Sequence, residues 1–301
     1  MRSKPMELSR TVKRSASVRA GGVLILLLFC VPFTSTWPLA KAQDPRAVAS
    51  RYIPQGSIIE QALRGNFGPC RDGIVAVYRM NENAGPRYAG LALIPAAGGG
   101  YREATLADIH QFDNLTVENS GISTVLFADL DGDRENEVLI LIKGLRRVPE
   151  SGSFLVVSVQ DWHEGAFRIL HDHERYFGDR CESALCVKSK IAALIQYRGS
   201  YVSHTAGISA DLAIALDESG VLTGTWHAVY GRAHFCDRLT FRVEPAGSSA
   251  NLVRWSDAAE RYEVIGHLAA SRFGATIRFV KDLGAFDCGA GHPLEIRLKR
   301  R

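Results

Sequence analysis

Short runs of apolar residues, each bounded by turn-forming residues, recur along most of this sequence. The runs are rich in Val, Ile, Leu and aromatic residues, and clusters of Gly, Pro, Asn or Asp separate them. This pattern is typical of β-strands that are joined by turns, so it predicts a mainly β fold. The runs lie at residues 73–80, 88–94, 121–128, 137–142, 154–162, 210–216, 221–230, 239–243, 263–267, 275–280 and 294–298.

The pattern divides the chain at about residue 198. The first part includes an uninterrupted apolar stretch, which predicts a central strand covered on both faces. It also shows helical spacing twice, around Ile58 and Leu63 and over residues 103–112. We therefore expect an α+β domain over residues 43–197. In the second part short hairpins follow one another without a helical pattern, so residues 198–301 predict a small antiparallel barrel or sandwich.

The first 42 residues have the order of charge and hydropathy that is typical of a secretory signal. Six basic side chains precede an uncharged run at residues 21–33, and Ala40-Lys41-Ala42 offers small residues at the two positions that signal peptidase reads. The apolar run is short for a membrane span, which takes about 20 residues. We expect cleavage before Gln43 and a periplasmic or secreted mature protein. An uncleaved membrane anchor is the alternative.

Removal of this segment reverses the sign of the net charge. Residues 1–42 carry a net charge of +6 and the whole chain +4, so residues 43–301 carry −2. A chain with this balance has no positive field that would attract nucleic acid or an anionic membrane by counterion release. We expect neither partner, and no membrane span after cleavage.

Five cysteines follow the predicted signal, and an oxidising compartment favours their pairing. We expect the pairs Cys181–Cys186 and Cys236–Cys288, which leave Cys70 unpaired. The spacing also allows Cys70 to pair with Cys181 or Cys186.

Residues 129–137 (DLDGDRENE) carry the most informative chemistry. The carboxylates of Asp129, Asp131, Asp133 and Glu137 occupy positions 1, 3, 5 and 9 of a tight loop between two apolar runs, and the Glu135 carbonyl occupies position 7. Calcium takes six to eight oxygen ligands, and alternate residues of a curled loop can supply them. Without a cation these carboxylates repel one another. The segment therefore predicts a calcium site, and a solvated acidic turn is the alternative.

The same stretch resembles the calcium loops of FG-GAP and VCBS-type repeats. In these loops an apolar strand enters D-x-D-G-D-G-x-x-[DE] and another apolar strand leaves. The match covers residues 124–142 and departs at Arg134, where the family usually has a Gly that allows a positive φ. The resemblance implies a structural calcium ion. Such repeats normally come many to a chain and form a propeller, but this chain has one copy.

No sequence motif indicates a catalytic residue. The segment His171-Asp172-His173-Glu174 favours a polar loop over a metal site, and Trp226 favours core packing over a ligand pocket. We expect an exported, non-catalytic binding protein with a protein partner in the cell envelope. By analogy alone, that partner would be a cell-wall hydrolase, against which the protein acts as an inhibitor or immunity factor. The alternative is a metal-dependent periplasmic hydrolase that uses the acidic loop.

Overall fold

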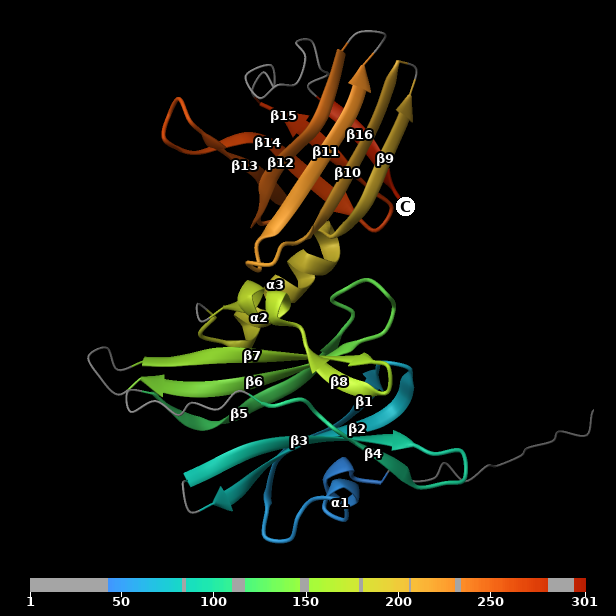
Figure 1. Ribbon diagram of the computed structural model, residues 1–301, viewed down its shortest axis with the longest axis vertical. Coiled ribbons are helices and arrows are strands. Elements are labelled where there is room, and N and C mark those ends of the chain that lie inside the picture. Colours follow the sequence, from blue (N-terminus) through green and yellow to red (C-terminus); the bar gives the residue numbers. More distant parts are fainter. Residues whose placement is uncertain are drawn as a thin grey trace, which may run out of the picture. The chain divides into compact units, whose positions relative to one another are not determined.

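The computed structural model describes residues 43–82, 85–109, 117–146, 152–178, 181–205, 207–230, 234–280 and 295–301. The predicted signal at residues 1–42 lies outside them. The described strands form two antiparallel four-stranded sheets and one closed antiparallel barrel (Figure 1). The prediction of a mainly β fold is confirmed.

The two open sheets are meanders in which consecutive strands pair. The first sheet has the order β1-β2-β3-β4 and the second has the order β5-β6-β7-β8. The strands are β1 (Ile58–Phe67), β2 (Cys70–Glu82), β3 (Gly85–Pro95), β4 (Tyr101–Thr105), β5 (Val117–Ala128), β6 (Glu137–Arg146), β7 (Gly152–His163) and β8 (Ala166–Ile169). Three helices accompany them: α1 (Pro45–Ala49), α2 (His171–Phe177) and α3 (Ala184–Tyr197).

Strand β6 contributes to two different hydrophobic clusters. It pairs with β5 on one edge and β7 on the other, so it is a central strand. Val138, Ile140 and Ile142 pack with buried residues of the first sheet. Leu139 and Leu141 belong to the cluster that also contains residues of α3 and of the barrel. Both faces of the strand are therefore covered, as its uninterrupted apolar sequence predicts.

The barrel contains the remaining strands, and its closure depends on the pairing of the last strand with the first. The strands are β9 (Gly199–Thr205), β10 (Ile208–Leu216), β11 (Leu222–Tyr230), β12 (His234–Ala246), β13 (Ser249–Ser256), β14 (Arg261–Ser271), β15 (Gly274–Phe279) and β16 (Glu295–Arg300). Lys299 lies opposite Val202, and Arg300 lies opposite Tyr201. Trp226 has no exposed surface, and its ring centroid lies 5.7 Å from that of Phe279. The prediction that Trp226 belongs to the core is confirmed.

The helix predictions were wrong. Ile58 and Leu63 lie in β1 because this segment pairs with β2 over almost its whole length. Glu103 lies in β4, which pairs with β3 and ends at Thr105. The segment that begins at His171 was predicted to be a loop and forms α2 instead. Residues 43–197 thus contain both strands and helices, but the helices are at other positions.

None of the helices in the described part of the chain has the length and hydropathy that a bilayer span requires. Residues 43–301 form a single compact unit. The division at residues 197 and 198 stays a prediction, although β9 begins at Gly199.

Candidate metal site between β5 and β6

The acidic segment is the loop of the β5–β6 hairpin. Ala128 and Glu137 face each other as the last pair of the ladder, so the intervening residues must reverse the chain. Two of them take a positive φ, namely Gly132 at 82° and Arg134 at 76°. Arg134 stands where the resemblance places a glycine, and it takes the positive φ with a Cβ present. For a residue with a Cβ this conformation costs about 1–2 kcal/mol.

The aspartate side chains hold the loop by accepting backbone hydrogen bonds. Asp129 accepts from the amides of Gly132 at 2.6 Å and Arg134 at 3.1 Å through its two carboxylate oxygens. Asp131 accepts from the amide of Asp133 at 3.0 Å. Aspartate commonly stabilises turns in this way, with or without a cation. These bonds alone do not distinguish a metal loop from an acidic turn.

Glu137 differs from the side chains of a solvated turn because its carboxylate is buried. Its side chain is 1 % exposed, Oε2 accepts from the Leu130 amide at 2.5 Å, and the buried Oε1 has no hydrogen-bond partner among the described residues. Burial raises the pKa of Glu137 to about 8, and the charges of Asp131 and Asp133 add to the shift, while the Leu130 amide opposes it. An unpaired buried carboxylate is costly unless a cation or a proton neutralises it.

The structure brings together three of the five predicted ligands. One oxygen each from Asp129, Asp131 and Glu137 lies within 4.8 Å of the others. Two oxygens that bind one calcium ion at about 2.3–2.6 Å are at most about 5 Å apart, so the spacing fits. The same group does not include Asp133 or Glu135. Their roles as ligands stay predictions.

Asp133 and Glu135 lie on the outer part of the loop. Asp133 is exposed, and it accepts a hydrogen bond of 2.7 Å from the Glu135 amide. The pKa of Glu135 is raised, first by partial burial and then by the neighbouring charges of Asp133, Asp161 and Asp131. An added cation would relieve this repulsion for both side chains.

Residues outside the acidic segment, which the local sequence does not indicate, also hold the loop in place. The Asn136 side chain donates to the Asn66 carbonyl at 3.0 Å, and the Gly68 amide donates to the Asn136 carbonyl at 3.0 Å. The Arg198 guanidinium donates to the Leu130 carbonyl. These partners are 68 residues or more away in the chain, so no local pattern could have indicated them.

A cavity of about 500 Å³ adjoins the loop. Asp129 and Asp131 line one part of it, and Arg198, Arg300 and Arg301 line another. The Arg301 guanidinium pairs with Asp211 at 2.7 Å. Carboxylates and guanidinium groups thus border the same space.

The cysteines follow the predicted pattern where the structure describes them. Cys181 and Cys186 form a disulfide, and Cys70 is free and buried. Cys236 is disulfide-bonded, and its predicted partner Cys288 lies outside the described residues. The alternative that joins Cys70 to Cys181 or Cys186 is excluded by the observed pair.

Comparison with known proteins found no family model that matches this chain. No curated protein sequence and no solved structure matches it either. The function of this protein must therefore be inferred from the site itself.

Proposed function

We propose that this protein is an exported, non-catalytic binding protein whose 129–137 loop holds a structural calcium ion. The single observation that carries the metal proposal is the buried Glu137 carboxylate, whose Oε1 lacks a hydrogen-bond partner among the described residues. It lies beside Asp129 and Asp131 at a spacing that one calcium ion can bridge. The two positive charges of the ion would offset most of the charge of the three carboxylates, with the outer loop residues and water supplying further oxygens.

Calcium is favoured over softer metals by the donor set. All three grouped residues are carboxylates, and the grouping includes no His or Cys. Oxygen-only sites suit calcium, magnesium and manganese, whereas zinc and copper prefer nitrogen or sulfur ligands. Calcium also tolerates irregular geometry and extra backbone oxygens better than magnesium does. The resemblance of residues 124–142 to FG-GAP and VCBS-type loops supports the same choice.

A structural role for the ion is supported by the position of the three carboxylates. The hydrogen bonds of Leu130 join its amide to Glu137 and its carbonyl to Arg198, the residue that ends α3. Binding at Asp129, Asp131 and Glu137 would therefore stiffen a segment that is already packed in the core. At a free calcium level 100 times the dissociation constant, the ion would add about 2.7 kcal/mol to the free energy of unfolding.

Thermal unfolding of the mature protein tests the metal proposal. We expect calcium to raise the melting temperature relative to excess chelator, and Asp131→Ala to abolish the shift. Asp217→Ala is the matched control, because Asp217 also accepts hydrogen bonds in a turn, from Ser219 and Val221, but lies outside the metal group. It should lower stability and keep the calcium shift. Identical melting of the wild type in chelator and in millimolar calcium would reduce the loop to an acidic turn.

The export proposal has its own tests. N-terminal sequencing of the mature protein should begin at or near Gln43, and recovery of intact Met1 from the soluble fraction would contradict export. A pull-down from an envelope extract, with and without calcium, tests the partner class. Capture of a specific cell-wall hydrolase that loses activity on binding supports the role of inhibitor or immunity factor.

The cavity beside the loop favours a second candidate, a metal-dependent hydrolase. A cation at Asp129 and Asp131 could bind a substrate oxygen in this space, and Arg198 or Arg301 could stabilise an anionic group there. A panel of phosphate and carboxylate esters, assayed with calcium, magnesium and manganese, separates the candidates. Metal-dependent turnover that Arg301→Gln weakens would favour the enzyme.

A further inference from the structure

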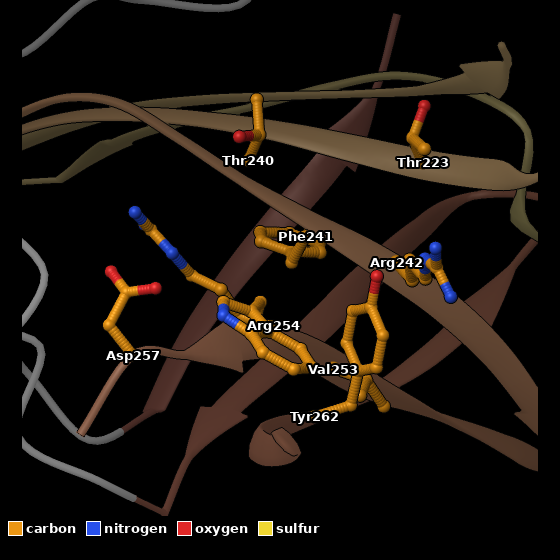
Figure 2. A pocket seen from close by; sticks show the side chains of 9 residues that line it. Thr223, Thr240, Phe241, Arg242, Val253, Arg254, Asp257 and Tyr262 are labelled. Atoms are coloured by element: carbon orange, nitrogen blue, oxygen red, sulfur yellow. The ribbon is translucent and has the colours of Figure 1, made fainter. Parts of the chain in front are cut away.

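The outer wall of the barrel carries a pocket that is separate from the acidic loop. It has a volume of about 350 Å³ and is lined by residues of β11, β12, β13, the β13–β14 turn and the start of β14. Thr223 lies opposite Arg242, and Trp255 lies opposite Tyr262, so each pair projects from one face of the sheet. Figure 2 shows Phe241 between the two threonines on one side and Tyr262 on the other. No residue of the acidic loop lines this pocket.

Two aromatic rings in the pocket are exposed and already fixed in place. Trp255 and Tyr262 are each 46 % exposed, although large aromatic side chains usually gain by burial. Their centroids are 5.2 Å apart with the rings nearly perpendicular, and the Arg242 guanidinium lies 4.2 Å from the Tyr262 centroid. These contacts hold the rings in place before any ligand binds. The entropic cost of ordering the two side chains on binding is therefore smaller.

The polar groups around the rings supply both donors and acceptors. The side chains of Thr240 and Asp257 line the pocket, and neither makes a hydrogen bond or ion pair within the described part of the chain. Figure 2 shows Asp257 and Arg254 at one end of the pocket and Arg242 at the other. Charges of both signs therefore border the pocket, two guanidinium groups and one carboxylate. This mixture disfavours a cationic ligand and suits one whose groups both donate and accept hydrogen bonds.

We propose that this pocket binds a neutral oligosaccharide. A sugar ring has an apolar face of C–H groups that can stack on Trp255, and its hydroxyl groups both donate and accept hydrogen bonds. The acceptors at Asp257 and Thr240 and the guanidinium donors at the rim match these hydroxyls. The volume is within the lower range of small-molecule sites and suits one or two sugar rings. The inference goes beyond the proposed calcium-dependent role and does not depend on it.

Titration of the mature protein with chitotetraose, cellotetraose and maltotetraose tests this inference by calorimetry and tryptophan fluorescence. We expect a dissociation constant below about 1 mM for at least one of them. Trp255→Ala should weaken that binding by about tenfold or more, and Asp257→Asn should weaken it less. Phe273→Ala is the matched control: Phe273 is 72 % exposed and lies 4.5 Å below an Arg272 guanidinium, but does not line the pocket.

Circular dichroism and melting curves of each variant establish that it is folded. Failure of all three tetrasaccharides to bind at millimolar concentration would overturn the inference, as would equal binding by folded Trp255→Ala. If no sugar binds and Trp255→Ala instead removes capture of an envelope protein, the pocket is a protein-docking site and the inference is also overturned. Sugar binding that persists in chelator supports it even if the calcium proposal fails.

Discussion

Replacement of Glu137 by Gln removes one buried carboxyl group while keeping its size and its hydrogen-bond acceptor for the Leu130 amide. In the metal-free protein, burial raises the pKa of Glu137 from its ordinary value of 4.5 to about 8. Between these two values the folded protein holds a proton that the unfolded chain releases. The free energy of unfolding therefore falls as the pH rises, and the contribution is fully present only below the ordinary pKa.

The size of this change in the free energy of unfolding follows from the pH range between the two pKa values. One pKa unit corresponds to about 1.4 kcal/mol, so the wild type should lose about 2.5 kcal/mol between pH 5 and pH 7 from this group alone. The amide of Glu137→Gln does not titrate, so the free energy of unfolding of the variant should not show this fall. For a chain of this size 1 kcal/mol shifts the melting temperature by about 2–4 °C, so the variant should gain roughly 5–10 °C on the wild type across this range.

Chemical unfolding, followed by circular dichroism in excess chelator at several pH values from 5 to 8, measures this difference. Glu218→Gln is the control, because Glu218 is exposed at the tip of the β10–β11 hairpin. In saturating calcium the wild type should be more stable than Glu137→Gln, since the ion binds the ionised carboxylate and the amide is a weaker ligand. Parallel pH profiles of wild type and Glu137→Gln in chelator would refute the reasoning that Glu137 is a buried, uncompensated carboxyl group.

Three further predictions concern the backbone, the disulfide and the barrel interior. Arg134→Gly should raise the free energy of unfolding by about 0.5–1 kcal/mol in urea, because glycine adopts the positive φ of this position without the clash of a Cβ; a loss of stability would mean that the Arg134 side chain contributes more than its backbone strain costs. The double variant Cys181→Ser, Cys186→Ser should lower the free energy of unfolding by about 2 kcal/mol. Non-reducing peptide mapping should show the Cys181–Cys186 link, and Cys70 should react with a thiol reagent only after unfolding. A peptide that joins Cys70 to either partner would contradict the pairing. Gly224→Ala should destabilise the protein by about 1–3 kcal/mol, because its Cβ would clash with the buried Phe241 ring; an unchanged melting curve would show that Phe241 can move aside.

The sequence indicated secondary structure well only where a single pattern allowed one interpretation. The five consecutive apolar residues of β6, between a turn and a charged residue, suit a buried central strand and little else. Around Ile58 and Leu63, by contrast, the few apolar residues fit one face of a short helix as well as a strand. The ladder with β2 decided between them, and that ladder depends on residues further along the chain.

For the acidic loop, local sequence was enough to predict Asp129, Asp131 and Glu137 as a group, because all three lie within nine consecutive residues of one hairpin. The burial of Glu137 was beyond such reasoning, since it results from core packing around Leu130. The Arg198 contact and the adjoining cavity also come from remote segments. The pocket around Trp255 needs four strands in register before its residues meet.

By itself, then, the sequence determined the mainly β class, most strands and the acidic hairpin, because each of these depends on residues close together in the chain. It favoured the Cys181–Cys186 pair, and the structure decided between that pair and the alternatives with Cys70. Tertiary structure alone decided that the second half is a closed barrel. Barrel and sandwich have the same alternating strands and hairpins, and they differ here in whether β16 pairs with β9. That pairing joins Tyr201 to Arg300 across about a hundred residues, a distance over which sequence periodicity carries no information.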